Sequence, residues 1–371
     1  MRIGLIVYGD LEQASGGYLY DRMLVAHLRK RGHHVQVISL PWRSYAGFLA
    51  DNFSRRLFNT IRRLEVDLLL QDELNHPSLF LLNRRLKKET SFPIISVVHM
   101  VRSNAAVHPF LKWFYGWVER RYLDSADGFV FNSLETKRLV NSMVFQRKPF
   151  VVATPGGDRF RSRVTPAEIR ARARQPGPLR VLFLGSLTRH KAPHLLLEAA
   201  AKLGPETIYL TLAGRQDVQP DYVRYLRRLA ARRGLGGWVH FIGHLEGKFL
   251  ASRLKRSQVL AVPSAYEGYG IAYLDGLGFG LPAIGTRAGG AKEIIRHGKN
   301  GYLIPAGNVA EVARAFKKLH EDRQRLTRMS LSALRSFQTF PSWKESMERV
   351  YRFLNRYNQS SSRTHSPRRK K

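Results

Sequence analysis

Short apolar runs alternate along the chain with segments that suit helices. In the first part of the chain these runs carry little polar alternation, which is typical of parallel strands buried on both faces. Helices fit between them, for example at 18–31, which ends at Gly32. The strands predicted in this part are 3–7, 35–40, 67–70, 94–98, 128–131 and 150–153.

A second series of the same kind begins near residue 179. Helices again fit between the apolar runs, for example at 193–203 and 221–233. Two successive series predict two doubly wound α/β domains, whose ligands bind at the carboxyl ends of the strands. The strands predicted here are 179–184, 208–213, 239–242, 259–262, 283–285 and 302–304.

The two series are separated by a segment of different composition. Residues 159–178 are basic, contain Pro and Gly, and have few large apolar side chains. We interpret this segment as a linker between an N-terminal domain, 1–158, and a C-terminal domain, 179–340. A chain of 371 residues is long enough for two domains of ordinary size.

The two ends of the chain carry further signals. Residues 1–8 lack the long apolar core and cleavage site of a signal peptide, so we expect a first strand there. Ser342 and Glu345 have the spacing of a capping box, which predicts a last helix at 341–357 that returns toward the N-terminal domain. The Ser-rich, basic tail at 358–371 is expected to be disordered.

Composition changes this picture mainly through charge. The chain has 62 Lys and Arg residues against 28 Asp and Glu, a formal net charge of +34. Such a surface attracts nucleic acid, anionic lipid headgroups or phosphorylated substrates, although solubility alone explains it equally well. No nucleic-acid docking motif is present, so we expect no specific nucleic acid partner. The absence of cysteine fits a reducing compartment, and no apolar run is long enough to span a membrane.

The most informative stretch follows the predicted strand at 259–262. Gly268 and Gly270 let the backbone approach a ligand, and a helix pattern starts near Ile271. Unpaired amides at a helix start, together with the helix dipole, form a phosphate site. A buried strand, a turn and a core helix would give a similar pattern. A second Gly-Gly turn and two carboxylates within the same stretch favour the phosphate site.

These motifs resemble those of the retaining glycosyltransferases of family 4, over roughly residues 1–350. The resemblance implies an α/β chain with the GT-B fold, in which two Rossmann-like doubly wound parallel-sheet domains face a central cleft. It places the acceptor on the N-terminal domain and the nucleotide sugar on the C-terminal domain. The motifs that carry it are Pro263-Ser264-x-x-Glu267-Gly268-x-Gly270, Gly280-Leu281-Pro282 and Gly289-Gly290-x-x-Glu293.

The resemblance assigns catalytic roles to three residues. Glu267 would lie beside the transferred sugar, Lys191 would stabilise the leaving diphosphate, and His99 would face the donor sugar. The chain departs from the family at two further positions. Asp275 replaces the second glutamate, which binds the ribose, and Ser186 replaces an arginine that binds the diphosphate.

Without that arginine, either Arg189 would have to fold back toward the phosphate or the phosphate would be held less tightly. The resemblance also implies that the leaving diphosphate helps to deprotonate the acceptor, so no nucleophile of the protein is required. A lysine and helix amides take the place of a metal cation in such enzymes, so neither a cofactor nor a metal is expected to be required. The donor-binding residues it implies are Gly16, Gly17, Arg189, Gly214, Gly243, Gly268, Tyr269, Gly270, Ile271, Asp275 and Glu293.

The segment 109–122 is dense in aromatic residues with basic residues beside them, which describes either a helix at a membrane surface or a core helix. We therefore predict a cytoplasmic enzyme, peripheral on the cytoplasmic face of a membrane. It would transfer a hexose from a nucleotide sugar, with UDP favoured over GDP, to a lipid-linked or cell-envelope glycan. The alternatives are an epimerase-like GT-B enzyme, a non-catalytic relative and, less favoured, a polyanion-binding protein.

Overall fold

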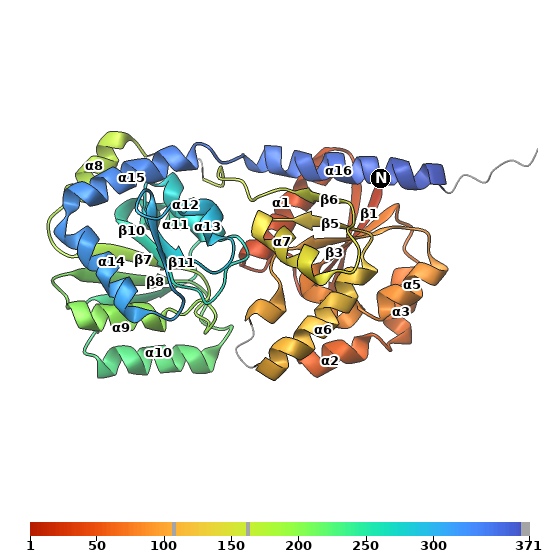
Figure 1. The fold of residues 1–371 in the computed structure, drawn as a ribbon, viewed down its shortest axis with the longest axis horizontal. Helices are drawn as coiled ribbons and strands as arrows, with labels where there is room; N and C mark the ends of the chain where they lie inside the picture. Colours follow the sequence, from red (N-terminus) through yellow and green to blue (C-terminus); the bar gives the residue numbers. More distant parts are fainter. Residues whose placement is uncertain (106–108, 161–163, 365–371) are drawn as a thin grey trace, which may run out of the picture. The chain divides into compact units, whose positions relative to one another are not determined.

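The computed structural model describes residues 1–105, 109–160 and 164–364 (Figure 1). The chain divides into two compact units. Unit 1 comprises Met1–Pro155 and Trp343–Lys371, and unit 2 comprises Gly156–Ser342. Each unit contains one six-stranded parallel sheet with helices packed on it, so the prediction of two doubly wound α/β domains is confirmed.

The sheet of unit 1 has the strand order β2-β1-β3-β4-β5-β6. Three of its inner strands, β3, β4 and β5, are buried at every position, which explains why their sequences are apolar without alternation. The strands are β1 (Arg2–Tyr8), β2 (His34–Leu40), β3 (Leu68–Asp72), β4 (Ile94–Val98), β5 (Gly128–Phe131) and β6 (Phe150–Val152). The helices are α1 (Gly16–Lys30), α2 (Tyr45–Asp51), α3 (Arg55–Arg62), η1 (Glu73–Asn75), α4 (His76–Leu79), α5 (Leu82–Glu89), η2 (Arg102–Ala105), α6 (Pro109–Ser125), α7 (Leu134–Met143) and α16 (Trp343–Thr364).

The sheet of unit 2 has the strand order β12-β11-β10-β7-β8-β9. Predicted and observed bounds coincide at β7, β8 and β10, where the apolar runs are fully buried or nearly so. The strands are β7 (Leu179–Leu184), β8 (Ile208–Ala213), β9 (Val239–Gly243), β10 (Val259–Val262), β11 (Ala283–Thr286) and β12 (Gly301–Ile304). The helices are α8 (Pro166–Arg174), α9 (His194–Leu203), α10 (Pro220–Arg232), α11 (Gly247–Arg256), α12 (Ile271–Gly278), α13 (Ala291–Ile294), α14 (Val309–Glu321) and α15 (Arg323–Phe337).

The strand orders locate where each unit can bind a ligand. In unit 1 the order reverses between β1 and β3, and in unit 2 it reverses between β7 and β10. In sheets of this kind the connecting helices leave to opposite faces at such a point, which opens a crevice at the carboxyl ends of the two strands. The loops after these strands are therefore where functional side chains are expected.

The segment 159–178 is not a linker, in contrast to the prediction. Helix α8 lies within it at Pro166–Arg174, begins with a capping box between Thr165 and Glu168, and packs against α15. It buries Ile169 in the core of unit 2, and the Arg172 guanidinium donates to the carbonyl oxygens of Phe279 at 2.7 Å and Gly280 at 3.1 Å. The prediction failed because one isoleucine and the stem of a buried arginine anchor this helix, and composition alone does not reveal them.

The last helix is longer than predicted. Helix α16 continues to Thr364, so residues 358–364 are helical rather than disordered, whereas 365–371 lie outside the described residues. Its buried residues include Val350 and Leu354, and it packs against α1 and β6 of unit 1. The Ser346 hydroxyl donates to the carbonyl oxygen of Thr154 at 2.5 Å. The chain therefore returns to unit 1 after completing unit 2.

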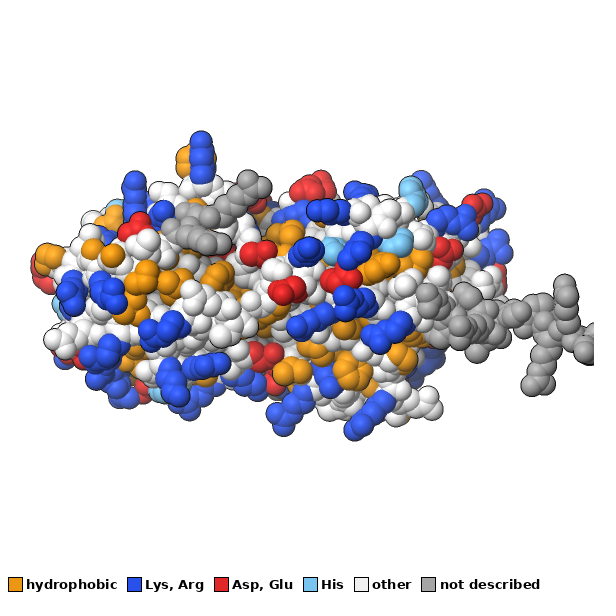
Figure 2. All heavy atoms as spheres, turned by 90° about the horizontal axis from the view of Figure 1, so that it is seen from above, with side chains coloured by type: hydrophobic (Ala, Val, Ile, Leu, Met, Phe, Trp, Pro, Cys, Tyr) orange, Lys and Arg blue, Asp and Glu red, His pale blue; other side chains and the backbone are white. Residues whose placement is uncertain are grey.

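The basic residues do not form a single patch on the face seen in Figure 2. Lys and Arg side chains are scattered over it among hydrophobic and acidic ones. A distributed positive charge supports solubility and general attraction to anions rather than one docking surface. Within the described part of the chain, no helix has the length and apolar character needed to cross a membrane.

Candidate functional site

Glu267 and Lys191 meet where the strand order of unit 2 reverses. Lys191 lies in the loop after β7, and Glu267 lies in the loop after the neighbouring strand β10. The Lys191 ammonium donates to Glu267 Oε1 at 2.6 Å, and the Ser264 hydroxyl donates to the same oxygen at 2.6 Å. The structure thus brings together two of the three predicted catalytic residues and adds Ser264.

The charges of this group follow from its surroundings. Burial opposes ionisation of Glu267, but Lys191 and Ser264 outweigh it and hold the pKa of this carboxyl below its usual range. Glu267 is therefore a carboxylate at neutral pH. The Glu267 side chain is 8% exposed, whereas the Lys191 side chain is 28% exposed. The ammonium can therefore contact a ligand on its exposed side while it stays paired with the buried carboxylate.

The Gly289-Gly290 turn fixes the backbone of Glu267. The amide of Gly290 donates to the Glu267 carbonyl oxygen at 2.8 Å, and Glu267 and Gly289 form a parallel bridge. A Cβ atom on Gly289 would lie 2.0 Å from that carbonyl oxygen, so any side chain here would displace the loop. Glu293, predicted to bind the donor, is the third residue of the short helix α13 that follows this turn.

The predicted phosphate-facing turn leads into α12. Gly270 is the N-cap residue and has a φ of +101°, in the left-handed region that favours glycine. Ile271 is the first residue of the helix, and Gly268 lies in the loop before it. Tyr269 is buried in the hydrophobic core of unit 2, so its backbone rather than its ring is left to contact a ligand.

Asp275 has a partner that the sequence did not indicate. It lies on α12, is almost fully buried, and accepts a hydrogen bond from Arg159 Nη1 at 3.1 Å. Burial raises the pKa of Asp275 to about 6, although Arg159 opposes the shift. Arg159 falls in the segment interpreted as a linker, which is why it was not singled out.

Arg189, predicted to compensate for the missing arginine at Ser186, lies on an aromatic ring in this structure. It is exposed, and its guanidinium lies over the ring of Tyr222 on α10, 5.2 Å from the ring centroid. Its backbone amide donates to the Gln219 side chain at 2.9 Å. In this structure a neighbouring aromatic ring thus binds the guanidinium, and its fold-back toward the phosphate stays a prediction.

Gly214 and Gly243 lie together at the ends of β8 and β9. The amide of Gly214 donates to the carbonyl oxygen of Gly243 at 2.7 Å. A Cβ atom on Gly214 would lie 1.8 Å from the carbonyl oxygen of Gly185, so the loops after β7 and β8 approach each other here. The structure thus brings these predicted glycines to the same edge of the sheet as Lys191.

The third predicted catalytic residue, His99, belongs to unit 1. It follows β4, and its Nε2 lies 2.9 Å from Asp21 Oδ1 on α1. A Cβ atom on Gly17 would lie 3.1 Å from the His99 ring, so the first turn of α1, with Gly16 and Gly17, lies against the imidazole. Asp72, at the end of β3, offers a carboxylate oxygen close to the same Asp21 and His99 atoms.

This group holds a charged histidine. Burial disfavours the imidazolium, but Asp21 outweighs it and raises the pKa of His99 to about 9. Burial and the nearby Asp21 raise the pKa of Asp72 to about 7. His99 Nδ1 is buried and has no hydrogen-bond partner among the described residues. A protonated His99 thus keeps one N–H free to donate.

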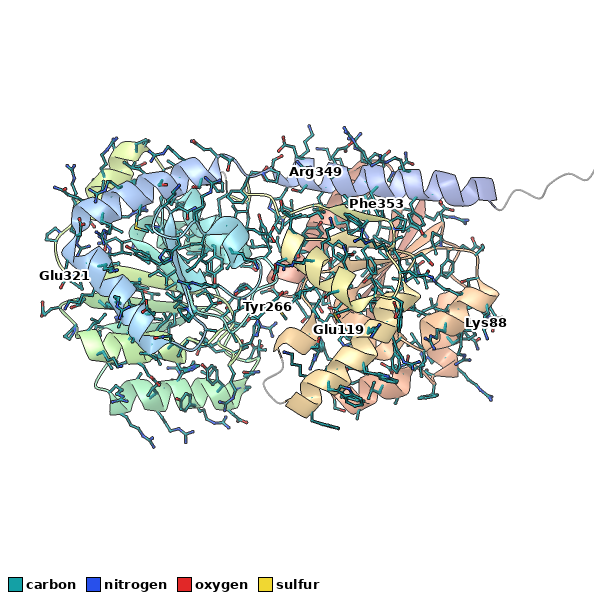
Figure 3. The ribbon with its side chains drawn as sticks, in the orientation of Figure 1. Lys88, Glu119, Tyr266, Glu321, Arg349 and Phe353 are labelled. Carbon is teal, nitrogen blue, oxygen red and sulfur yellow. The ribbon has the colours of Figure 1, made fainter. Side chains whose placement is uncertain are left out.

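A second buried acidic group lies nearby in unit 1. Glu73 in η1, His76 in α4 and Glu119 on α6 are almost fully buried, and Figure 3 labels Glu119. Glu119 accepts from the Arg102 amide at 2.5 Å and from the Ser103 hydroxyl at 2.6 Å. Burial raises the pKa of both Glu73 and Glu119 to about 8, so the two carboxyls retain protons at neutral pH.

We expect Glu73→Gln to weaken the pH dependence of stability. A folded-state pKa near 8 lies above the unfolded value of about 4.3, so this group stabilises the fold at low pH and loses that contribution as pH rises. Glutamine removes the titrating group and keeps a donor for Glu119. Thermal unfolding between about pH 5 and about pH 9 should show a smaller loss of Tm in the variant.

The exposed Glu65 provides the matched control, because Glu65→Gln changes the same charge on the surface. This control should follow the wild-type pH profile. Equal slopes for wild type and Glu73→Gln would contradict the assignment of a protonated carboxyl pair.

Sequence reasoning missed Asp21, Asp72, Arg159 and the pair formed by Glu73 and Glu119. Asp21 had a signal that could have been used, because it interrupts the apolar face of the helix predicted at 18–31. The others acquire their partners only through folding, since each pairs with a residue distant in sequence.

Unit 2 resembles a known family in sequence. Residues 165–335 match the model of a family described as glycosyl transferases group 1. A D-inositol 3-phosphate glycosyltransferase of Pseudarthrobacter chlorophenolicus is 30% identical over 214 residues, which are 55% of this chain and 50% of that protein. The chain spans about half the length of the curated relatives it matches.

Solved structures resemble the chain over nearly its whole length. Sucrose-phosphate synthase from Thermosynechococcus elongatus has a TM-score of 0.81 at 19% identity and covers 97% of this chain and 99% of its own. The Anabaena protein HepE, solved in complex with UDP-glucose, has a TM-score of 0.75 at 18% identity, with 96% and 100% covered. This likeness establishes the fold, and the predicted GT-B class of two Rossmann-like domains is confirmed.

Proposed function

We propose that this chain, whose residues 165–335 match the model of the glycosyl transferases group 1 family, is a retaining glycosyltransferase of family 4. It would transfer a hexose from a nucleotide sugar, UDP in preference to GDP, to a hydroxyl group of a lipid-linked or cell-envelope glycan. Relatives with UDP-glucose or inositol phosphate in their names support this choice of substrate class without identifying the substrate of this chain.

The observation that carries the proposal is the Lys191–Glu267 pair at the reversal point of the second sheet. A departing nucleoside diphosphate gains negative charge as its bond to the sugar breaks, and a positioned cation lowers the energy of that state. Lys191 is the cation, Glu267 and Ser264 hold it in place, and the first turn of α12 offers free backbone amides.

In the proposed reaction, the bond between the anomeric carbon and the diphosphate oxygen breaks. The acceptor oxygen forms a new bond to the same carbon on the same face of the sugar. The proton of the acceptor hydroxyl passes to the leaving diphosphate, so the step requires no nucleophile from the protein. Asp275 would accept hydrogen bonds from the ribose while Arg159 compensates its buried charge.

His99 would act in its protonated form. Its Nε2 is bound to Asp21, and Nδ1–H is left to donate to a substrate oxygen. The loss of this proton should therefore reduce activity as pH rises through the pKa of His99, near 9.

We expect Asp21→Asn to move this alkaline limit downward. Without the carboxylate, the pKa of His99 should fall to its ordinary value of about 6.5 or below, so the variant loses activity near neutral pH while the wild type remains active. Profiles of kcat/KM against pH measure the shift. Asp221→Asn, at an exposed position of α10, is the control and should leave the profile unchanged. A uniform loss across all pH values would contradict this role.

The proposed function is tested with a panel of UDP- and GDP-sugars. Release of the nucleoside diphosphate, with and without glycan acceptors, shows whether the chain catalyses transfer, and NMR of the product gives the anomeric configuration. Transfer with retention from a UDP-sugar is the expected result. An inverted product would overturn the mechanism, and absence of both UDP binding and turnover would favour a non-catalytic relative.

A lipid-linked acceptor would bring this enzyme to a membrane surface, and α6 supports that partner. Phe110 is 63% exposed and Trp113 is 66% exposed, whereas Val118 and Tyr122 farther along the helix are buried. The interpretation as a core helix therefore holds only for the second half of α6. Exposed aromatic residues of this kind insert at the headgroup level of a bilayer.

Co-sedimentation with vesicles tests this partner. The wild type should bind phosphatidylglycerol vesicles more strongly than neutral ones, and Phe110→Ser/Trp113→Ser should lose most of that binding. Phe249→Ser, which removes an equally exposed aromatic from unit 2, should not. Equal binding to neutral and anionic vesicles would count against a role for membrane charge.

A further inference from the structure

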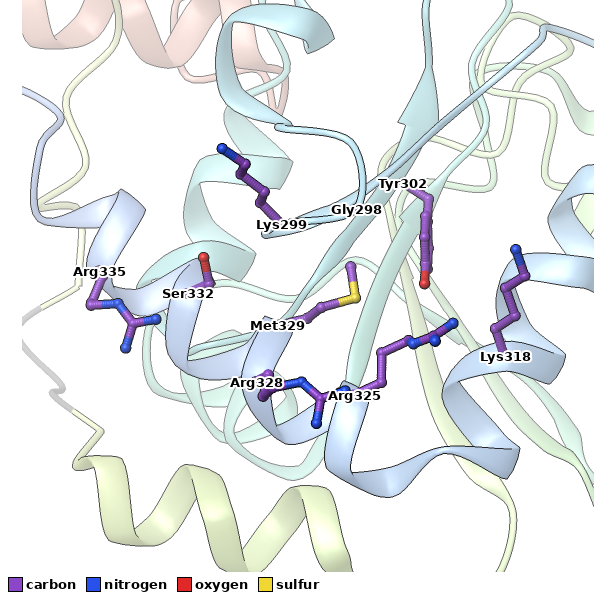
Figure 4. Close-up of a pocket in the computed structure, with 9 residues that line it drawn as sticks. All are labelled: Gly298, Lys299, Tyr302, Lys318, Arg325, Arg328, Met329, Ser332 and Arg335. Carbon is purple, nitrogen blue, oxygen red and sulfur yellow. The ribbon is translucent and has the colours of Figure 1, made fainter.

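Unit 2 contains a concave site that neither Lys191 nor Glu267 lines. It has a volume of about 540 Å³ and is formed by the turn before β12, β12 itself and helices α14 and α15 (Figure 4). The lining residues are Gly298, Lys299, Tyr302, Lys318, Arg325, Arg328, Met329, Ser332 and Arg335.

The lining is strongly cationic. Five of its nine residues are Lys or Arg, against 62 of 371 in the whole chain, so this pocket is enriched beyond the general basic character of the protein. Arg325 and Arg328 share Asp322 at 3.4 Å and 3.9 Å. Lys299, Lys318 and Arg335 have no ion pair within the part of the chain that the structure describes. Several cations brought together without matching acids repel one another unless an anion binds between them.

The backbone of the turn on one side of the pocket is fixed by hydrogen bonds. The turn that carries Lys299 is fixed by Asn300, which accepts from the Arg296 amide at 2.7 Å and donates to the Ile294 carbonyl oxygen at 3.0 Å. Gly298 in the same turn has a φ of +75°, a conformation that favours glycine. Lys299 is thus carried by a turn of defined backbone, and in Figure 4 its side chain points away from the arginines of α15.

The pocket is distinct from the proposed donor site. The turn at Gly298 and Lys299 precedes β12, whereas Lys191 and Glu267 follow β7 and β10. Because all strands of this sheet are parallel, the turn at Gly298 and Lys299 lies at the amino ends of the strands, whereas Lys191 and Glu267 lie at their carboxyl ends. Neither Lys191 nor Glu267 lines the pocket.

We propose that this pocket binds a small ligand that carries two or more phosphate groups. Arg and Lys donors match phosphate oxygens, and the buried side chain of Met329 with the ring of Tyr302 offers an apolar surface for the body of the ligand. The volume suits a small molecule. The same chemistry describes a free polyphosphorylated metabolite or the multiply phosphorylated headgroup of a lipid, and the experiment below distinguishes them.

The test measures binding of inorganic tripolyphosphate by calorimetry at physiological ionic strength. Lys191→Met is used as the background, so that the proposed donor site has lost its cation. In this background tripolyphosphate should bind with one site per chain. Lys318→Gln/Arg335→Gln, which removes two unpaired and exposed charges, should weaken binding by about tenfold or more. Glutamine maintains helix propensity at both positions.

The matched control is Arg228→Gln/Arg232→Gln, which removes the same charge from exposed positions of α10 outside the pocket. It should change the affinity by less than about twofold, because distant surface charges are screened by salt. Equal weakening by the two double variants would overturn the proposal, since binding would then reflect net charge. Absence of binding in the Lys191→Met background would overturn it as well.

A second arm identifies the source of the phosphates. Vesicles that contain phosphatidylinositol 4,5-bisphosphate are compared with phosphatidylserine vesicles of equal total charge. Preference for the bisphosphate lipid, lost in Lys318→Gln/Arg335→Gln, supports a lipid headgroup. Binding of soluble tripolyphosphate without that preference supports a free metabolite. The donor-sugar assay involves none of these residues, so failure here leaves the proposed transferase activity standing.

Discussion

Lys191→Met is expected to reduce glycosyl transfer by about 10²–10³-fold in kcat, the typical cost of removing one preorganised charge-stabilising group. Methionine approximates the length of the lysine side chain but carries no charge, so the departing diphosphate loses its cation. The effect should fall on kcat more than on KM, because the negative charge on the diphosphate grows as the glycosidic bond breaks. Steady-state kinetics with the best donor of the panel measure both.

Two further variants show whether the loss of activity comes from the charge at position 191. Lys191→Arg retains the charge and should recover part of the activity, whereas Lys202→Met removes an exposed lysine on α9 and should change nothing. The Met variant leaves the Glu267 carboxylate without its cation, so thermal unfolding must show that the chain remains folded. Wild-type kcat in a folded Lys191→Met variant would contradict the proposed site.

Glu267→Gln should cost about 10²-fold in kcat, comparable to the loss of one oriented polar group in an active site. Glutamine has nearly the same shape, so the hydrogen bond to Ser264 can be retained. What is lost is the negative charge that holds the Lys191 ammonium at 2.6 Å. The pKa of Glu267 lies below its usual range, so this charge is present throughout the neutral range and is lost only on the acid side.

A double-mutant cycle tests whether the two residues act as one unit. If Glu267 works by positioning Lys191, Lys191→Met/Glu267→Gln should be hardly worse than Lys191→Met alone. Additive losses would instead give Glu267 an independent contact with the sugar. Ser264→Ala, which removes only the second hydrogen bond to Oε1, should have a smaller effect than either single variant.

The strands were predictable from the sequence because burial on both faces requires uninterrupted apolar runs. The observed bounds of β4, β5, β7, β8 and β10 coincide with the predicted ones. Helix α8 and the end of α16 were not predictable in this way. An arginine whose guanidinium binds buried carbonyl oxygens has the same composition as a solvated linker, as Arg172 demonstrates.

The candidate site was likewise predictable only in part. Glycine spacing and the carboxylate after β10 are local features, so the sequence pointed to the loop of Glu267 and to the helix start at Gly270. The partner of each charge is a tertiary property. Asp275 was expected at the ribose, and only the fold shows that Arg159 approaches it. Arg189 was expected at the phosphate, and the fold places it on Tyr222.

By itself the sequence determined the class of the fold and the loops that carry chemistry, because apolar periodicity and glycine positions act over a few residues. Only the tertiary structure decided which charges meet. Lys191 and Glu267, and likewise Asp21 and His99, are far apart in the chain, and the parallel sheets and the helices packed on them bring each pair together. Electrostatic energy depends on distance in space and on burial, and neither can be read from the order of residues.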